Sequence, residues 1–548
     1  MPHFLLVRAP GPCGTIKPMR FRALTFILCS AAAFDGAACS SDALQADGDG
    51  GTQPEGGALD GALPDPDGAL PGNDAAQPGE GGASDASKDA KAGDADAEPP
   101  PTYVHYDINH VLSTGASDSV ANGASAFITT TQPFGNLMFD TGVMTAGSCN
   151  GSGCTVYQTP SAFAPLVEGD KFFNYGVETI SSGLGNQANV FASQYFTKVG
   201  LPAVEHAVLV SLHGRSGNPY WCLRLQTANV QPGFGPCYFP TSAGYIAPFD
   251  EALMQVQSAK ALATAAGKTY AVRAVTVIQG QGESDSNEQN FDFLVSTDGT
   301  NTRLLNYTDA LLDWQWGYDN KVRAITGQAQ PVPMFVSQFG SMTTPTSIIP
   351  QRQLDAHTKS NGKVNLVTPN YPFTHFTDCL HYSPHSQRRL GAYFAKAYER
   401  VVVEGKKWEP TRPLSVTRAG AVITVKYVVP VPPLVIDTVR VDATSTDFAV
   451  QPVYGFIYRD STMSASITNV AVTAPDTVTI TLSAAPTGAD RLLRYAYEQQ
   501  SANACPGPTN GARGNIRDSD PTLAYHNDAA GNPYELFNWS VAYQLAVP

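Results

Sequence analysis

The segment VRAVTVIQGQGESD, residues 272–285, decides the fold class. It begins as a mostly apolar run, as expected for a parallel strand that is covered on both faces. It ends in a polar loop with two glycines, where the backbone can approach a ligand closely. In open α/β sheets the ligand crevice lies at the carboxyl ends of the strands, so we expect this loop to border a binding site.

Other apolar runs of similar length predict further strands at Ile108–Ser113, Ala207–Leu212, Val332–Ser337 and Val364–Val367, beside the one at Val272–Ile278. Helical patterns alternate with these runs. Alternation of strands and helices predicts a three-layer α/β/α sandwich around a parallel sheet.

Three helices are expected between and after the strands. The first runs from about Glu251 to Ala266, with Asp250 as its N-cap and Gly267 as its stop. The second begins near Leu304. The third begins at Pro384 behind an N-cap at Ser383 and ends at Gly405.

Composition changes after Trp408. The remainder is rich in Val, Thr and Pro, with alternating stretches such as AVITVKYVV and VTITLS, and helical patterns vanish. We therefore predict an α/β domain over residues 102–408 and a β-sandwich-like domain over residues 409–548. The second domain either binds glycan through aromatic rings or braces the first; the candidate rings are Tyr454, Tyr458, Tyr495, Tyr497, Tyr534, Trp539 and Tyr543.

The N-terminus has the pattern of an export signal, residues 1–39. Basic residues Lys17, Arg20 and Arg22 precede an apolar run that is too short to span a bilayer. Small residues before Cys39 resemble a bacterial lipoprotein cleavage site, which predicts lipid attachment at Cys39; ordinary cleavage with release is the alternative. We expect an exported protein, lipid-anchored on the cell surface or the periplasmic side of a membrane, or secreted.

A linker follows at residues 40–101. It is built of Gly, Ala, Asp and Pro, which cannot bury enough apolar surface to offset the entropy of ordering. The linker holds 14 Asp and Glu and two Lys, so it carries -12 of the formal net charge of -14. The rest of the chain is close to neutral. A near-neutral body excludes the basic footprint of a nucleic-acid-binding protein, and we expect membrane contact only through Cys39.

Cysteine usage agrees with export. Cys13 and Cys29 leave with the signal, and beyond Cys39 six cysteines remain. An even number in an oxidising compartment predicts disulfides, and free buried thiols are the alternative. The local pairs would be Cys149–Cys154 and Cys222–Cys237, which leaves Cys379 for Cys505.

Three short segments at predicted strand ends carry candidate chemistry. In LSTGASDSVANG, residues 112–123, a strand runs into Gly115, and Ser117 follows, as a nucleophile on a sharp turn requires. In TDCLHYSPH, residues 377–385, Asp378 precedes His381 by three residues and can orient its imidazole. In VIQGQGESD, residues 277–285, Gln281 offers N–H donors for an oxyanion. Each pattern is weak alone, because a turn Ser, a capping Asp or a polar loop has the same letters.

Together these segments resemble the SGNH hydrolase superfamily, in particular its sialate O-acetylesterase and carbohydrate acetylesterase branch. That branch carries G-Q-S-N after the first strand, Q-G-E-S-D after the third and D-G-x-H before the last helix. Here residues 115–118 read GASD, residues 281–285 read QGESD and residues 378–381 read DCLH, in the same order. The resemblance covers roughly residues 105–404 and implies a flavodoxin-like α/β/α fold.

The resemblance implies a serine esterase that removes acyl groups, in particular acetyl, from carbohydrate. Ser117 would be the nucleophile, His381 the general base and Asp378 its orienter. The remaining implied roles are an oxyanion hole from Ser117, Gly217 and Gln281, with Gly214 as the alternative glycine, and Glu283 lining the site or holding its loops together. No metal or cofactor is implied, and His375, His381 and His385 lack the acidic partners of a metal site.

Two positions depart from the family pattern. Ala116 replaces Gln, and Asp118 replaces Asn, which places a carboxylate beside the nucleophile. Ser119 offers an alternative register, since Ser119 and Gly123 reproduce a Ser-x-x-x-Gly spacing found in the superfamily. These departures leave a second function open, a surface carbohydrate-binding lipoprotein with a catalytically decayed esterase fold. A lipase or peptidase is a third reading, although no long apolar lid is visible.

Overall fold

The computed structural model describes residues 103–146, 157–169, 176–226, 246–286, 294–340, 347–444, 452–497 and 505–548. Residues from Asp94 onward form one compact unit. The expected export signal, Cys39 and the linker 40–101 lie outside the described residues, as do Cys149, Cys154 and Cys237. Within the described ranges, no helix combines the length and the apolar character that crossing a membrane requires.

The α/β part is built on a seven-stranded sheet. Its order across the sheet is β3 (Phe163–Pro165), β2 (Leu137–Phe139), β4 (Val208–Leu212), β1 (Ile108–Gly115), β5 (Tyr270–Ile278), β6 (Met334–Gln338) and β7 (Val364–Pro369). Neighbouring strands are parallel except for β3, which runs antiparallel to β2 at the edge. All five strands predicted from apolar runs are present, with ends that differ by one or two residues.

The strand order reverses at β1. Counted along the chain, the long parallel strands β1, β4, β5, β6 and β7 lie in the order 2-1-3-4-5, which is a doubly wound arrangement. β4 pairs with one side of β1 and β5 pairs with the other. The crevice of such a sheet opens beyond the carboxyl end of the strand at the switch point, which here is Gly115.

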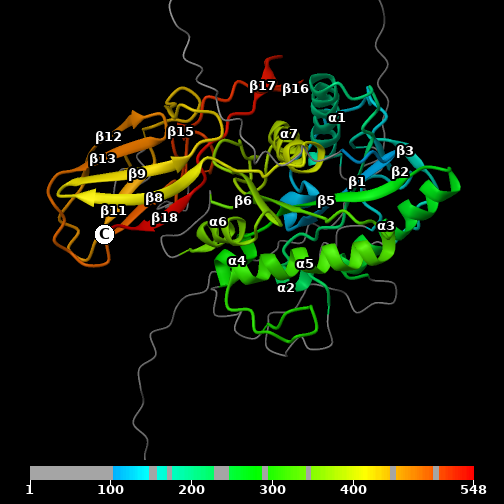
Figure 1. The fold of residues 1–548 in the computed structure, drawn as a ribbon, viewed down its shortest axis with the longest axis horizontal. Coiled ribbons are helices and arrows are strands. Elements are labelled where there is room, and N and C mark those ends of the chain that lie inside the picture. The colour runs from blue at the N-terminus through cyan, green and yellow to red at the C-terminus, as the bar shows by residue number, and fades with distance from the viewer. Residues whose placement is uncertain are drawn as a thin grey trace, which may run out of the picture. The chain divides into compact units, whose positions relative to one another are not determined.

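Helices cover both faces of this sheet (Figure 1). α1 (Ile180–Val199) and α7 (Pro384–Tyr398) pack against each other on one face and share a core with it. α3 (Pro248–Ala265), α5 (Tyr307–Thr326) and α6 (Ile349–Lys359) cover the opposite face. The α1–α7 crossing is close because glycines meet backbone there: a Cβ on Gly183 would lie 2.0 Å from the carbonyl oxygen of Arg388.

The predicted helix ends are partly wrong. α3 begins at Pro248 with Ala247 at the N-cap, so Asp250 lies in the first turn and is not the cap. Proline at the first helical position accounts for the earlier start, because it needs no N–H partner there. α5 begins at Tyr307, three residues after the expected start at about Leu304, and is capped by the side chain of Asn306. The Ser383 cap of α7 is confirmed, since Ser383 accepts a hydrogen bond from the N–H of Ser386.

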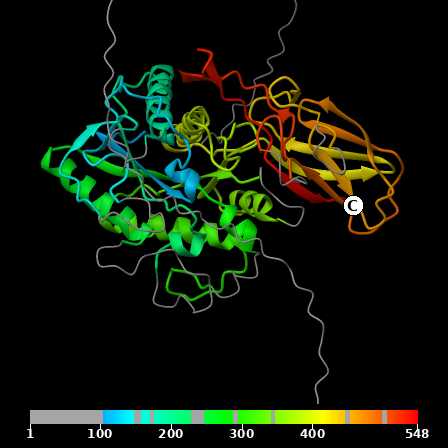
Figure 2. The same cartoon turned by 180° about the vertical axis from the view of Figure 1, so that it is seen from behind.

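Residues after the π-helix Glu399–Val403 form antiparallel sheets (Figure 2). One sheet holds β12 (Ile467–Ala474), β13 (Thr477–Leu482), β9 (Val422–Val428) and β8 (Arg412–Ala419). A second holds β11 (Phe456–Arg459), β14 (Leu492–Tyr495) and β18 (Tyr543–Ala546). Two-stranded pairs join β10 (Val435–Ile436) to β15 (Ile516–Arg517) and β16 (Leu523–Asn527) to β17 (Pro533–Glu535). All the candidate glycan-binding rings except Tyr454 are buried in this part of the chain.

The apolar core runs without interruption from the α/β part into the β part. Gln338, at the end of β6, binds both backbone polar groups of Ala542: its amide nitrogen donates at 2.8 Å and its oxygen accepts at 2.6 Å. Tyr371 donates its hydroxyl to the carbonyl of Ser540 at 2.8 Å. The ends of β6 and β7 are therefore fixed by the C-terminal strands, and a domain boundary at residues 408–409 stays a prediction.

We expect Gly115→Ala to cost far more stability than Gly267→Ala. Both glycines have positive φ, +135° and +66°, so alanine is strained at each. A Cβ on Gly115 would also lie 2.0 Å from the carbonyl oxygen of Ile278, whereas none of the nearby atoms lies within 4 Å at Gly267. Urea unfolding should give a loss of about 1 kcal/mol for Gly267→Ala and at least about 3 kcal/mol for Gly115→Ala. Equal losses would contradict the close β1–β5 contact.

Candidate active site

A pocket opens beyond the carboxyl ends of β1, β5, β6 and β7, where the strand order predicts the crevice. Ser117 and Asp118 enter it from the turn after β1, and Gln281 enters it from the start of α4 (Gln281–Ser286). Leu380 and Tyr382 border it from the loop before α7. The pocket thus joins all three segments that the sequence singled out.

Ser117 lies on a tight turn. β1 ends at Gly115, the N–H of Ala116 donates to the carbonyl of Ile278 at 3.1 Å, and a 3-10 helix follows at Ser117–Val120. Ser119 is turned away from the pocket: its hydroxyl donates to the carbonyl of Ala116 at 2.6 Å. Ser117 lines the pocket and is 6% exposed, whereas Ser119 is absent from the lining.

Asp378 and His381 form a bonded pair on the loop before α7. One carboxylate oxygen of Asp378 lies 2.7 Å from Nδ1 of His381. The other accepts the backbone N–H groups of Leu380 and His381 at 2.9 and 3.0 Å. Partial burial acts to raise the pKa of Asp378, but these hydrogen bonds and the nearby imidazole outweigh it and lower that pKa. Asp378 therefore stays ionised and holds the imidazole with Nδ1 toward it.

One hydrogen bond joins the turn of Ser117 to the loop of His381. The N–H of Tyr382 donates to Oδ1 of Asp118 at 3.0 Å. Gln387, in the first turns of α7, donates to the backbone carbonyl of Asp118 at 2.8 Å. Gly123 allows the close approach, because a Cβ there would lie 3.1 Å from Cβ of His381 and 3.2 Å from Oδ2 of Asp378.

The hydroxyl of Ser117 and the imidazole of His381 lie in adjacent segments but do not share a hydrogen bond. Nε2 of His381 is buried, and no partner for it exists among the described residues. In unliganded enzymes, catalytic hydrogen bonds are often long and tighten only when substrate binds. The arrangement thus leaves the one ring nitrogen that a general base needs without a competing partner.

Asp118, the residue that departs from the family pattern, bonds with its carboxylate to the loop of His381. Burial raises its pKa to about 6, while the Tyr382 N–H and the neighbouring His381 act to lower it. Above this pKa the group is mainly ionised, and its carboxylate is directed to the N–H of Tyr382.

Of the other expected donors, Gln281 lines the pocket and Gly217 does not. Gly217 has φ +71°, with open space where a Cβ would sit. Gly214 is packed tightly behind the turn of Ser117, and a Cβ on it would lie 2.8 Å from the carbonyl oxygen of Gly115. Neither glycine is placed by this structure within the pocket.

Glu283 holds loops together. It is 1% exposed, receives two hydrogen bonds from the side chain of Gln279 at 2.9 and 3.1 Å, and accepts the N–H of Tyr220. Gln279 also donates to the carbonyl of Asn218 at 3.2 Å. Of the two roles that the resemblance left open for Glu283, these contacts favour fixing the loop after β4 against the loop after β5.

Sequence reasoning missed the buried polar network behind the loop after β4. Arg215, 2% exposed, pairs with Glu251 on α3 at 2.5 Å. Glu251 also accepts the N–H of Ala146 at 2.9 Å, and Gln255 donates to the carbonyl of Leu212 at 2.9 Å. The sequence signal was an Arg inside HGRSGNPY, a block otherwise considered only for its glycines.

The Cys379–Cys505 disulfide is confirmed. It falls between Asp378 and His381 in sequence and ties their loop to the start of the segment before β15. Gly507, two residues beyond Cys505, lies against the same loop: a Cβ there would be 3.1 Å from the carbonyl oxygen of Phe373. Cys222 is also disulfide-bonded, and its predicted partner Cys237 lies outside the described residues.

Among the described residues, no group of three or more His, Cys, Asp or Glu side chains is arranged to hold a metal ion. His375 packs against the ring of Tyr382, and burial lowers its pKa to about 4. His385 lies 2.7 Å from the hydroxyl of Tyr534. The three histidines of this loop therefore have separate protein partners.

No protein-family model and no curated protein matches the chain. Among solved structures, a carbohydrate acetylesterase from Xanthomonas citri is similar over 80% of each chain, with 11% sequence identity and a TM-score of 0.41. A protein from Arabidopsis thaliana matches 55% of this chain and 98% of its own, with 11% identity and a TM-score of 0.30. At these TM-scores neither likeness assigns an activity to this chain.

Substitutions of Asp118 should distinguish the effect of its charge from the effect of its hydrogen bond to Tyr382. The folded-state pKa of about 6 lies above the ordinary 3.8, so the folded protein binds this proton more tightly than the unfolded chain. Stability from this group is present below pH 3.8 and is lost as pH rises through about 6. Relative to wild type, Asp118→Asn should therefore gain about 2–4 °C in Tm at pH 8 and nothing at pH 4.

Asp118→Ala is the matched control, because it removes both the charge and the acceptor for the Tyr382 N–H. Asparagine keeps an acceptor oxygen. Turnover of p-nitrophenyl acetate at pH 8 should fall by about tenfold or more in Asp118→Ala and stay near wild type in Asp118→Asn. Equal turnover in the two variants would show that the bond to Tyr382 does not position the loop.

Removing the disulfide should loosen the loop that carries His381. For Cys379→Ser with Cys505→Ser we expect a loss of about 2–4 kcal/mol in the free energy of unfolding and a fall in kcat for p-nitrophenyl acetate. Wild type treated with dithiothreitol should show the same fall, and the double variant should not respond to the reductant. A lower Tm with unchanged kcat in the double variant would mean that the bridge stabilises the fold without positioning the catalytic loop.

Proposed function

We propose that this protein is a serine esterase of the SGNH hydrolase type that removes O-acyl groups, in particular acetyl, from carbohydrate. The observation that carries the proposal is a pocket that Ser117 and Gln281 line together with Leu380 and Tyr382, the two neighbours of His381 in sequence. His381 is bonded to Asp378 on that same loop, and Asp118 bonds across to Tyr382. The doubly wound strand order and the QGESD segment after β5 support the same family. Export, the lipid anchor at Cys39 and the domain division remain part of the proposal.

In this mechanism His381 accepts the proton of the Ser117 hydroxyl through Nε2 as the oxygen attacks the ester carbonyl. Asp378 stabilises the imidazolium that forms. The imidazolium then gives the proton to the sugar oxygen as the bond between that oxygen and the acyl carbon breaks, which releases the sugar hydroxyl and leaves the acyl group on Ser117. Water deprotonated by His381 hydrolyses that acyl-enzyme and restores the free serine.

The oxyanion would be held by the N–H of Ser117 and the side-chain amide of Gln281. Two such donors are worth about 3–4 kcal/mol each when they are fixed in place before the reaction. Gln281 begins α4 directly after β5, and Glu283 in the same turn anchors that loop to Tyr220. The donor side chain is thus carried on a loop that is fixed by buried hydrogen bonds.

Pocket size favours a short acyl group. The pocket holds about 30 Å³, and one water molecule needs about 10–15 Å³ in the same measure. A group of acetyl size fits this space, and a long acyl chain does not. The same volume speaks against the lipase reading, since a lipase must accommodate a fatty chain.

Substitution of the two serines tests the nucleophile. Ser117→Ala should lower kcat for p-nitrophenyl acetate by at least about 10³-fold, because it removes the attacking oxygen. Ser119→Ala, the matched control on the same turn, should stay within about tenfold of wild type, since its hydroxyl only bonds Ala116. The reverse pattern would assign the nucleophile to Ser119. No hydrolysis by wild type, together with glycan binding, would favour the decayed binding protein.

A further inference from the structure

A second cavity lies against the same loop as His381 but away from the Ser117 pocket. It holds about 650 Å³, which is within the size range of small-molecule sites. Thr374, His385 and Arg389 line it from the loop before α7 and from α7 itself, and Tyr534, Glu535 and Trp539 line it from the C-terminal segment. The loop before α7 borders the candidate active site through His375, Leu380 and Tyr382. The same loop and the start of α7 border this cavity through Pro372, Thr374, His385 and Ser386.

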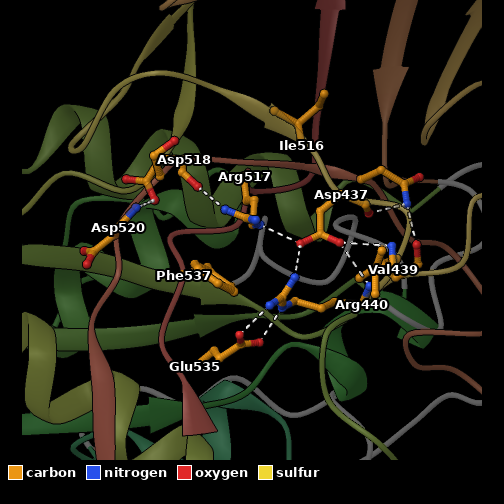
Figure 3. A network of polar contacts seen from close by, with 12 residues as sticks. Asp437, Val439, Arg440, Ile516, Arg517, Asp518, Asp520, Glu535 and Phe537 are labelled. Atoms are coloured by element: carbon orange, nitrogen blue, oxygen red, sulfur yellow. Dashed lines mark hydrogen bonds and ion pairs between the residues drawn. The ribbon is translucent and has the colours of Figure 1, made fainter.

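The cavity wall holds equal numbers of cations and anions, and Figure 3 shows one opposite pair of them, Arg440 and Glu535. Arg440 pairs with the carboxylate of Glu535 and reaches Asp437 at 3.0 Å. Arg389 donates to the carbonyls of Pro372 and Glu535 at 3.1 and 3.0 Å. Asp528 accepts the backbone N–H groups of its own turn. The two cations and two anions of the wall therefore balance in number; Arg440 and Glu535 pair with each other, while Arg389 and Asp528 are held by backbone groups.

The ring of Phe537 packs against Arg440, one of the residues of this wall. It lies between two guanidinium groups, with its centroid 4.8 Å from Arg440 and 3.9 Å from Arg517. Arg517 bonds Asp437 at 2.7 Å, the carboxylate that also holds Arg440 (Figure 3). Arg440 is therefore committed to this network and unavailable as an anion-binding group.

Uncharged polar side chains make up much of the rest of the wall: Thr374, His385, Ser386, Asn532 and Tyr534. Arg388 donates to the hydroxyl oxygen of Tyr534 at 3.2 and 3.1 Å, so the phenol proton is directed to Nδ1 of His385 at 2.7 Å. That assignment places the imidazole proton of His385 on Nε2, which can then donate.

A wall whose charges balance, and whose other polar groups are hydroxyl, amide and imidazole side chains, fits sugar hydroxyls, because these groups both donate and accept hydrogen bonds. We propose that this cavity binds an uncharged sugar unit of the carbohydrate whose ester enters the Ser117 pocket. The inference rests on the proposed function for the identity of that carbohydrate. It goes further in naming where the glycan lies and in specifying neutral saccharides as the class that is bound.

Leu523 is the residue to change, because it lines the cavity and is 53% exposed. An arginine there should obstruct the mouth without disturbing the core. Leu414 on β8, 62% exposed and outside the cavity lining, provides the matched control Leu414→Arg. Both variants should unfold at the wild-type Tm.

The kinetic test measures KM for two substrates, acetylated xylotriose and p-nitrophenyl acetate, the second of which has no sugar. Leu523→Arg should raise KM for acetylated xylotriose, relative to KM for p-nitrophenyl acetate, by about tenfold. Leu414→Arg should leave this ratio at the wild-type value. A ratio that is unchanged in Leu523→Arg, or raised equally in both variants, overturns the proposal.

Binding tests the cavity even if no hydrolysis occurs. Calorimetric titration of the full chain carrying Ser117→Ala would use xylotriose, cellotriose and mannotriose, with trigalacturonate as the anionic probe. At least one neutral trisaccharide should bind, about tenfold more weakly when Leu523→Arg is added and unchanged with Leu414→Arg. Binding of trigalacturonate alone, or of none of the four, overturns the proposal. Failure of the proposed function would instead appear as absent hydrolysis with this binding intact.

Discussion

The hydrogen bond from the Tyr382 N–H to Asp118 is the constraint on which the site depends. It joins residues 264 positions apart, one beside the candidate nucleophile and the other beside the candidate base. The bond from Gln387 to the carbonyl of Asp118 attaches α7 to the same turn. These two contacts connect the turn of Ser117 directly to the loop of His381 and to α7.

Further contacts hold the loop after β4 and the loop of His381 in place. Behind the loop after β4, the buried pair of Arg215 and Glu251 links that loop to α3. Behind the loop of His381, the Cys379–Cys505 disulfide and the contacts of the C-terminal strands restrict movement. Catalytic groups work when neighbouring packing and hydrogen bonds hold them near the productive geometry. The β part therefore contributes to the candidate site, because its residues contact the loop that carries His381 and are joined to it by the disulfide.

Local sequence signals predicted the parts of the fold that local chemistry controls. Apolar runs located the five long parallel strands, and Ser383 before Pro384 marked the start of α7. The Asp-x-x-His spacing predicted a pair that the structure forms at 2.7 Å. In each case the interaction lies within a few residues of chain.

Features that depend on tertiary contacts were not predictable in this way. α1 was missed although its apolar residues recur every four positions, at Ile180, Leu184, Ala188, Ala192 and Phe196. Ser181, Gly185 and Asn186 are buried beside this stripe, and such small and polar residues made the helical pattern inconspicuous. Asp118 was recognised as a carboxylate beside the nucleophile, but its hydrogen bond to a loop far away in sequence was not foreseen. Gly217 was the preferred oxyanion glycine, yet the pocket lining does not include it. Pairing partners distant in the chain leave no local pattern to detect.

The most direct measurement is a crystal structure of the protein after reaction with diisopropyl fluorophosphate. We expect phosphorus bonded to Oγ of Ser117 and a phosphoryl oxygen facing Gln281. We also expect Nε2 of His381 within hydrogen-bond distance of the modified oxygen. A label on another residue, or an imidazole that remains out of reach of a modified Ser117, would contradict it.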